Sequence, residues 1–416
     1  MLPMKYVIVH AGGMADHPRH ELSGRTPLQS ASIPHLDRVA QTSELGLVTV
    51  TLENGRYGSG LTGTSILGYE PRKYYQGPGP LEAASLGVNV GEHDVVYRCT
   101  MVTLRAEASG GSKGGTHDVK KLGSHVIMDE ATAGLITSEE ARELIDAVNE
   151  QVGSEVIQFY PGSGHRHLMV WVNGKPRALC SDPQSLVGRP INEALPAGDG
   201  ADMLRKLMEA SLLILRDHPV NNERRAAGLK PANCLWLWGE GRATLWPSLA
   251  ERFHVSGVVV ASSDVYRGIG LLAGLEAVEA DRLQGADLKT RATLTVEELK
   301  RKDFAYVHVE LPDEVMYGTD LKAKVSSIEQ VDRDFFGPFI QGLSHVGPYR
   351  LLVVCDPGLV HQIKPLENQW FYAYHDSTSP PAADASRRFT EADALASAIP
   401  PRDATKFVLR LFAKPS

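Results

Sequence analysis

Residues 6–16 read YVIVHAGGMAD, a short apolar and β-branched run that ends in glycines and an acidic residue. The same pattern, an apolar run followed by small or acidic residues, recurs at 258–264, 306–314 and 351–358. Such runs are typical of buried parallel strands, and in open α/β sheets ligands bind beyond the carboxyl ends of the strands. The sequence therefore predicts an α/β fold whose chemistry lies at these strand ends.

Helical patterns separate the predicted strands. Thr137 to Glu140 have the sequence of a capping box ahead of apolar residues at helical spacing. Residues 201–215 have one apolar face, which we expect to pack in a core. The residues predicted on that face are Met203, Leu204, Leu207, Met208 and Leu212. Two stretches rich in Gly, Ser or Pro, 109–115 and 378–385, are predicted loops.

Length and charge limit the function classes. The 416 residues fit two domains, or one large domain with an insertion. Acidic residues outnumber Lys and Arg by 50 to 43, so no global basic field attracts nucleic acid or an anionic membrane. The four cysteines are widely spaced, and neither a leader nor an apolar stretch of spanning length is evident. We expect a cytoplasmic protein with no nucleic-acid or membrane partner.

Three kinds of residue can carry chemistry. Ser65 follows small residues in GSGLTGTSILGYE (58–70) and is predicted at a helix N-terminus, either as a nucleophile or as a cap. Asp313 and Asp356 follow two predicted strands, where carboxylates can hold a hard cation, act as acid and base, or cap helices. Arginines near turns suit phosphate or carboxylate, although any one of them can equally form a surface ion pair. These arginines are Arg98, Arg166, Arg224 and Arg242.

The order of motifs resembles that of the archaeal-type cofactor-independent phosphoglycerate mutases, within the alkaline phosphatase superfamily. The matching stretches include GMAD, SILGYEPRKYY, GPLEAASLGV, KPANCLWLWGEGR and YVHVELPDE, in order between residues 4 and 356. The resemblance implies an alkaline phosphatase-like parallel-sheet core domain from residues 1–71 and 231–416, with an α+β cap domain inserted at 72–230. It also implies an isomerase or phosphotransferase in which two divalent metals, Mn or Mg, activate a serine that accepts the phosphoryl group of phosphoglycerate.

Several functional positions of the family are retained. The nucleophile maps onto Ser65, and two metal-binding aspartates map onto Asp313 and Asp356. On the cap side, the resemblance implies an anion-binding pocket for a small anionic metabolite. Its residues are Arg98, Arg166, His167, Asp182, Asn221, Arg224, Arg242 and, from the core domain, Arg267.

Other metal positions of the family differ in this chain. The aspartate that precedes GMAD is replaced by Gly12, and two histidine positions hold Tyr317 and Pro357. The last histidine falls in a dissimilar loop, where His361 and Lys364 are the candidates. The retained donors cannot close two sites for hard cations that take about six ligands each. We therefore expect no metal ligands and no cofactor, although the chain has 15 histidines.

Three functions remain open on the sequence. The first is an enzyme repurposed for metal-independent chemistry on a phosphorylated, carboxylate or amino-acid-like metabolite, in secondary metabolism. The second is an active 2,3-bisphosphoglycerate-independent phosphoglycerate mutase, or a homoserine kinase-like phosphotransferase, with an altered metal site. The third is a non-catalytic ligand-binding protein. We favour the first, because the substitutions fall on metal ligands while the scaffold motifs persist. Its predicted catalytic residues are Ser65, Asp313, Asp356, Tyr317 and His10.

Overall fold

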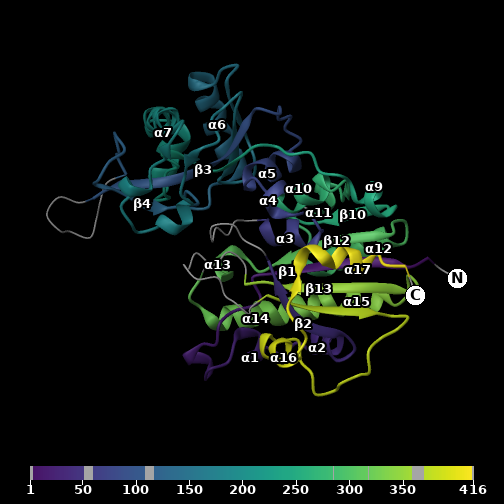
Figure 1. The fold of residues 1–416 in the computed structure, drawn as a ribbon. Helices are drawn as coiled ribbons and strands as arrows, with labels where there is room; N and C mark the ends of the chain where they lie inside the picture. Colours follow the sequence, from purple (N-terminus) through teal and green to yellow (C-terminus); the bar gives the residue numbers. More distant parts are fainter. Residues whose placement is uncertain are drawn as a thin grey trace. The chain divides into compact units, whose positions relative to one another are not determined.

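In a computed structural model, which describes residues 3–50, 60–107, 117–283, 285–316, 318–357 and 370–414, the chain forms two compact units (Figure 1). The first unit comprises Met1–Tyr75 and Leu245–Ser416, and the second comprises Gln76–Thr244. Each unit has its own sheet and its own hydrophobic core.

The first unit is built on an eight-stranded sheet. Its strands, from one edge to the other, are β11 (Glu276–Ala277), β10 (Gly257–Val260), β12 (Phe304–Glu310), β1 (Lys5–Gly12), β13 (Tyr349–Cys355), β14 (Phe371–Asp376), β2 (Glu44–Thr49) and β15 (Arg402–Asp403). The four predicted strands, β10, β12, β1 and β13, lie side by side and run parallel. This confirms the α/β fold and brings the predicted carboxyl ends to one edge. β14 is antiparallel to both of its neighbours.

Helices cover both faces of this sheet (Figure 1). Val7, Val9 and Ala11 of β1 point into the main core, because side chains alternate along a strand. That core is completed by α2 (Pro34–Gln41), α12 (Leu288–Leu299), α14 (Leu321–Val331), α15 (Gly337–Leu343) and α16 (Glu391–Ala396). The opposite face, which carries Ile8 and His10, is covered by α3 (Leu61–Ile66), α10 (Asp264–Leu272) and α17 (Phe407–Leu411).

Shorter helical segments complete the first unit. They are η1 (His20–Leu22), α1 (Pro27–Ser30), α4 (Pro71–Tyr74), α9 (Leu249–Phe253), α11 (Ala280–Leu283), α13 (Asp313–Met316), η4 (Asp332–Phe336) and η5 (Ala404–Lys406). The loop predicted at 378–385 is irregular and mostly exposed, as expected, whereas the loop predicted at 109–115 lies outside the described residues.

The second unit has an antiparallel sheet around the long strand β3 (Val95–Ala106). β3 pairs with β4 (Val126–Glu130), β6 (Arg166–Trp171) and β9 (Cys234–Gly241), and β6 pairs with β5 (Ile157–Tyr160). The helices of this unit are α5 (Pro78–Ser85), α6 (Ser138–Val152), α7 (Ala201–Arg216) and α8 (Pro219–Ala226). Smaller elements are β7 (Ala178–Leu179), β8 (Ala197–Gly198), η2 (Pro183–Leu186) and η3 (Asn192–Ala194).

Two helix predictions can be compared directly with the structure. The capping box is confirmed, because the Thr137 hydroxyl accepts from the Glu140 amide and the Glu140 carboxylate accepts from the Thr137 amide. The apolar face of α7 is confirmed except at Met203, which is 41% exposed. The buried stripe is centred on residues 204, 208, 211 and 215, and Met203 lies to one side of it on the helix.

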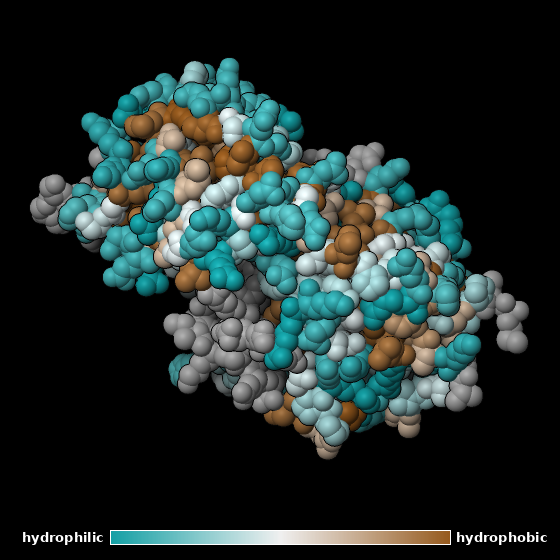
Figure 2. Space-filling view, turned by 45° about the horizontal axis from the view of Figure 1, so that its top comes forward, coloured by the Kyte–Doolittle hydropathy of each residue, from teal (hydrophilic) through white to brown (hydrophobic). Residues whose placement is uncertain are grey.

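The surface in view is mainly hydrophilic, with smaller apolar patches between the polar residues (Figure 2). No helix within the described ranges is long and apolar enough to cross a bilayer.

Glu44, the first residue of β2, is the centre of a charge network at the edge of the large sheet. Its carboxylate accepts hydrogen bonds from Tyr372 Oη at 2.5 Å, Arg402 Nε at 3.0 Å, and Arg410 Nη1 and Nη2 at 2.5 and 3.0 Å. Burial acts to raise the pKa of Glu44, but the bonds from Arg410 and Tyr372 and the two arginine charges outweigh it and lower that pKa to about 2.

Replacing Glu44 by Gln is expected to lower the free energy of unfolding by about 2 kcal/mol at pH 7, a value discounted for partial exposure. A depressed carboxyl pKa stabilises the fold above the unfolded pKa, here 4.5, and that stabilisation is lost as pH falls toward about 2. The difference between wild type and variant should therefore shrink across that interval in urea unfolding followed by circular dichroism. Glu21→Gln, at an exposed site, is the control. A difference that does not change with pH would contradict the assignment.

Candidate active site

The carboxyl ends of β1, β12 and β13 bear a buried group of polar and aromatic side chains. His10 is 0% exposed, His308 2% and Asp356 4%. β1 and β12 pair in a register that places His10 opposite His308, and Tyr306 lies on the same face of β12, two residues before His308. Tyr266 of α10 packs on both histidine rings. We call these five residues the strand-end cluster.

His10 links the cluster to the end of β13. Its Nε2 lies 2.8 Å from Asp356 Oδ2, and its Nδ1 lies 3.3 Å from Tyr306 Oη. With Asp356 ionised, Nε2 carries the hydrogen that it donates, and Nδ1 accepts from the tyrosine hydroxyl. Burial raises the pKa of Tyr306 well above its usual value, so the phenol keeps its proton. Asp356 Oδ1 also accepts from the Gly13 amide at 3.2 Å. Two predicted catalytic residues, His10 and Asp356, are thus in direct contact.

His308, like Tyr306 and Tyr266, is a member of the cluster that the sequence analysis did not predict. Neither ring nitrogen has a hydrogen-bond partner among the described residues, and Nδ1 lies 3.9 Å from the Glu310 carboxylate. The ring stacks on Tyr266 with centroids 3.4 Å apart. Burial lowers the pKa of His308 well below its usual value, so the ring is neutral at pH 7. A buried imidazole with no partner costs free energy unless a ligand, ion or water completes it.

Gly12 leaves open the space beside His308. A Cβ atom at this position would lie 3.1 Å from His308 Nε2 and 3.8 Å from Asp356 Oδ1. An aspartate at position 12, as in the family pattern, would therefore place its Cβ atom in tight contact with the imidazole. The glycine makes room for the His308 ring at the place where the family has an aspartate.

Ser65 is carried by α3 on the same face of the sheet. The helix approaches closely because Gly63 has no side chain; a Cβ there would lie 2.7 Å from Tyr306 Oη and 3.0 Å from Tyr266. The prediction that Ser65 lies at a helix N-terminus is wrong. α3 begins at Leu61, after the left-handed Gly60, so Ser65 is its fifth residue. The Ser65 hydroxyl is buried and donates to the Leu61 carbonyl at 2.9 Å.

Within the described ranges, no three His, Cys, Asp or Glu side chains are arranged to hold a metal ion. Gly12 and Pro357 offer no side-chain donor, so the family pair of metal sites does not form from these positions. The donors beside them are the Asp356 carboxylate and the imidazole of His308, because both ring nitrogens of His10 are already engaged, with Asp356 and Tyr306. Carboxylate and imidazole each suit divalent transition metals, but these two donors alone do not complete a site.

The remaining metal-site candidates cannot be placed. Asp313 begins α13, but its side chain lies outside the described residues. Tyr317, His361 and Lys364 also lie outside them.

Four predicted anion-binding residues of the second unit lie near the β3, β6 and β9 strands. Arg98 forms a two-point ion pair with Glu82, at 2.6 and 3.0 Å, and its guanidinium lies over the Trp238 ring. Arg166 is exposed at the start of β6. His167 Nδ1 accepts from the Gly162 amide, and its buried Nε2 has no partner in the part of the chain described. The buried Nε of Arg242 also has no hydrogen-bond partner among the described residues.

Burial lowers the pKa of His167, and that of the neighbouring His165, to about 3. His167 is therefore neutral at pH 7. Because its Nδ1 accepts a hydrogen bond, its hydrogen is on Nε2, which is free to donate to a ligand.

The other predicted binding residues have structural contacts. Arg224 is buried and binds Glu140 at 2.7 Å, together with the carbonyls of Lys230 and Ala133. Asn221 closes three hydrogen bonds, with the Leu215 carbonyl and with both backbone groups of Ala232. The structure therefore uses Arg224 and Asn221 to fasten α8.

The last two predicted binding residues, Asp182 and Arg267, lie at η2 of the second unit and on α10 of the first unit. Asp182 caps η2 by accepting from the Gln184 amide. Arg267 lies on α10 in the first unit, near Tyr266 in sequence.

Comparison with known proteins identifies the relatives of this chain. Residues 40–221 match the family model of 2,3-bisphosphoglycerate-independent phosphoglycerate mutase. A protein of Geobacter sulfurreducens named a probable 2,3-bisphosphoglycerate-independent phosphoglycerate mutase is 40% identical over 357 residues, 85% of each chain. The Methanothrix thermoacetophila enzyme of that name is 36% identical over 85% of this chain and 86% of its own.

Solved structures agree on the fold. A Pyrococcus horikoshii protein superposes with a TM-score of 0.73 at 21% identity, covering 100% of this chain and 99% of its own. The cofactor-independent phosphoglycerate mutase of Thermoplasma acidophilum superposes with a TM-score of 0.58 at 21% identity, covering 98% and 99%.

The mostly parallel sheet with its strand-end site defines an α/β enzyme with the alkaline phosphatase-like fold. Within that class, the chain belongs to the 2,3-bisphosphoglycerate-independent phosphoglycerate mutase family, as the motifs implied. It is a mutase-like enzyme of the isomerase class.

Family membership corrects the cofactor prediction. We expected no cofactor, but the chain is 40% identical over 85% of its length to a relative named a probable 2,3-bisphosphoglycerate-independent phosphoglycerate mutase, and the mechanism of that family, by the resemblance above, works with divalent metals. A lost donor at one position does not by itself mean a lost ion, because a site can exchange donor types, and His308 places an imidazole near Asp356. The comparisons favour the mutase over a repurposed, metal-independent enzyme of secondary metabolism.

Proposed function

We propose that this chain is an active 2,3-bisphosphoglycerate-independent phosphoglycerate mutase with an altered metal site. The observation that carries the proposal is the strand-end cluster, on the face of the sheet that α3 and Ser65 cover. In this cluster His10 and Asp356 are hydrogen-bonded next to His308, whose ring nitrogens have no hydrogen-bond partner in the described parts of the chain. The mutase names of relatives at 40% and 36% identity support the same activity.

In this proposal the Ser65 oxygen attacks the phosphorus of phosphoglycerate. A bond forms between that oxygen and phosphorus, and the bond to the first glycerate oxygen breaks. The serine hydroxyl loses its proton to solvent, and the departing glycerate oxygen takes one proton from solvent, so the step is balanced. The reverse transfer to the other glycerate hydroxyl restores Ser65. A divalent ion held in part by the Asp356 carboxylate and a nitrogen of His308 would make the serine hydroxyl more acidic and neutralise phosphoryl charge.

The chain's own residues have defined parts in this scheme. Asp356 fixes the tautomer of His10 and places negative charge at the strand ends. His308 remains neutral and offers one N–H donor and one acceptor nitrogen. In a cap domain at residues 72–230, His167 Nε2 and the guanidinium groups of Arg98 and Arg166 would bind the phosphate and carboxylate of the substrate.

The test is conversion of 3-phosphoglycerate to 2-phosphoglycerate, followed by phosphorus NMR without added 2,3-bisphosphoglycerate. Chelator-treated protein, and the same protein given Mn²⁺ or Mg²⁺, are compared, and the bound metal is measured by mass spectrometry. We expect turnover that depends on a stoichiometric metal. Metal-loaded protein that converts no phosphoglycerate would overturn the proposal, and phosphorylation of homoserine instead would move the chain to a related phosphotransferase.

A further inference from the structure

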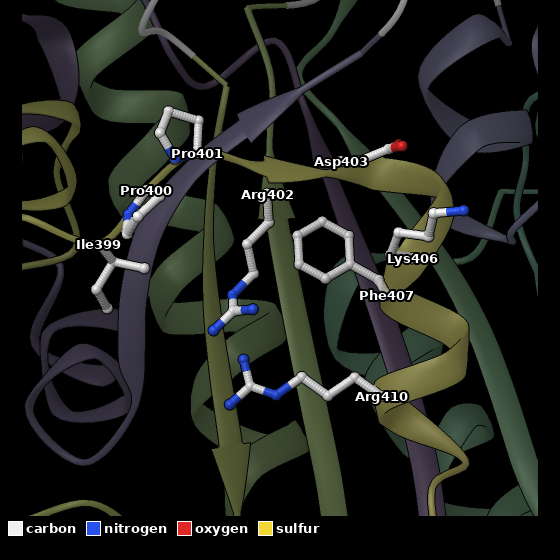
Figure 3. A pocket seen from close by; sticks show the side chains of 8 residues that line it. All are labelled: Ile399, Pro400, Pro401, Arg402, Asp403, Lys406, Phe407 and Arg410. Atoms are coloured by element: carbon white, nitrogen blue, oxygen red, sulfur yellow. The ribbon is translucent and has the colours of Figure 1, made fainter.

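The first unit contains a pocket on the C-terminal part of the chain, apart from the strand-end cluster. Its volume is about 320 Å³, at the lower end of the range for small-molecule sites. It is lined by Ile399, Pro400, Pro401, Arg402, Asp403, Lys406, Phe407 and Arg410 (Figure 3). These residues come from the segment before β15, from β15 and η5, and from α17.

Two arginines are held in place in this pocket. Figure 3 shows the guanidinium groups of Arg402 and Arg410 pointing toward each other beside the Phe407 ring. Both bind Glu44, and Arg410 also lies over the Tyr374 ring at 4.0 Å. A guanidinium has five N–H donors, so a single carboxylate leaves donors on both arginines for a second acceptor. The Glu44 network therefore orders two partly exposed cations before any ligand binds.

Lys406 is a third cation in the pocket lining. Lys406 is exposed and forms no ion pair within the described part of the chain. The Asp403 carboxylate, which also lines the pocket, forms no ion pair with Lys406 among the described residues; its Oδ1 caps η5 by accepting from the Thr405 amide at 2.9 Å and the Thr405 hydroxyl at 2.8 Å. Three cationic side chains therefore line the pocket, and two carboxylates, those of Glu44 and Asp403, lie next to them.

The rest of the wall is apolar. Ile399, Pro400 and Pro401 form one side, and the Phe407 ring lies beside the arginines (Figure 3). Cations next to a proline and aromatic surface suit a ligand that has an anionic group on an apolar body. An inorganic ion alone would leave this apolar wall unused.

We propose that this pocket is a second binding site, for a small anion with a phosphate, phosphonate or carboxylate group on an apolar body. The proposal does not depend on the mutase activity. β15 is four strand positions from β1 in the sheet, about 20 Å at the usual strand spacing. η5, which carries Lys406, also packs against α3, which carries Ser65. One element of the pocket wall therefore contacts the helix of the proposed nucleophile.

The test uses the full chain and phenylphosphonate, a probe that cannot be hydrolysed, in isothermal titration calorimetry. Two related compounds are titrated for comparison. Inorganic phosphate lacks the apolar body, and benzoate keeps the phenyl ring but has a carboxylate in place of the phosphonate. Lys406→Ala is expected to weaken phenylphosphonate binding about tenfold, as for loss of one charged hydrogen bond, and Lys406→Arg to restore it. Mutase turnover of Lys406→Ala should equal that of wild type, because Lys406 has no part in the proposed chemistry.

The binding site is located by a second measurement. Phenylglyoxal modification, mapped by peptide mass spectrometry, should show Arg402 and Arg410 protected when phenylphosphonate is bound. Lys322→Ala, an exposed lysine on α14, is the control for general surface charge. The proposal is overturned if Lys406→Ala binds as wild type does, if neither arginine is protected, or if Lys322→Ala weakens binding equally.

Discussion

Replacing Ser65 by alanine is expected to lower phosphoglycerate mutase turnover by about 1,000-fold or more, because the proposed reaction has no other acceptor for the phosphoryl group. The fold should survive. The variant loses one hydrogen bond, from the Ser65 hydroxyl to the Leu61 carbonyl, which is worth about 1 kcal/mol. Phosphorus NMR of 3-phosphoglycerate conversion measures the effect, and circular dichroism with urea measures the stability.

A matched variant separates chemistry from packing. Ser43→Ala removes another buried serine hydroxyl, one without a hydrogen-bond partner in the described residues, and should leave turnover unchanged. Transfer of labelled phosphate from substrate to protein is the more direct readout: wild type should be labelled on Ser65 and the alanine variant should not. Labelling that persists in Ser65→Ala would assign the nucleophile to another residue.

The central part of the fold was predictable because its pattern is local. The runs at 6–9, 258–261, 306–309 and 351–354 are apolar and β-branched, and each fills one buried strand of the parallel sheet. Three of the strands that were not predicted, β14, β2 and β15, depend on pairing between distant segments. Residues 371–374 pair with residues 44–47 and residues 402–403 pair with 48–49, and nothing in either partner's own sequence specifies that contact.

The site was predictable as a set of strand-end residues but not as a geometry. His10 and Asp356 are 346 positions apart and meet only because β1 and β13 are neighbours. His308 was overlooked inside an apolar strand, although the alternation in YVHVEL places it on the same face as Tyr306. Arg224 has the residue type of an anion ligand, but its partner Glu140 is 84 positions away, and this contact gives it a structural role that sequence cannot indicate.

Asp356→Asn is expected to lower mutase turnover about 100- to 1,000-fold and to reduce the metal content of the purified protein. The side chain keeps its size but loses its charge. Asp356 accepts from both His10 Nε2 and the Gly13 amide, whereas an asparagine has one oxygen for these two donors. His10 can adapt by moving its hydrogen to Nδ1, since the Tyr306 hydroxyl can accept as well as donate. The cluster should therefore stay folded while its charge is lost.

Asp332→Asn is the matched control for this experiment. Asp332 is also buried, 1% exposed, and its carboxylate accepts from the backbone amides of Leu36 and His35 on the other face of the sheet. Both asparagine variants disturb a buried carboxylate with two donors, so both should cost about 1–3 kcal/mol of folding stability. Only Asp356→Asn removes charge from the strand ends, and therefore only it should lose turnover and metal. Equal losses in the two variants, or turnover of Asp356→Asn within tenfold of wild type, would remove Asp356 from the reaction and leave it a purely structural carboxylate.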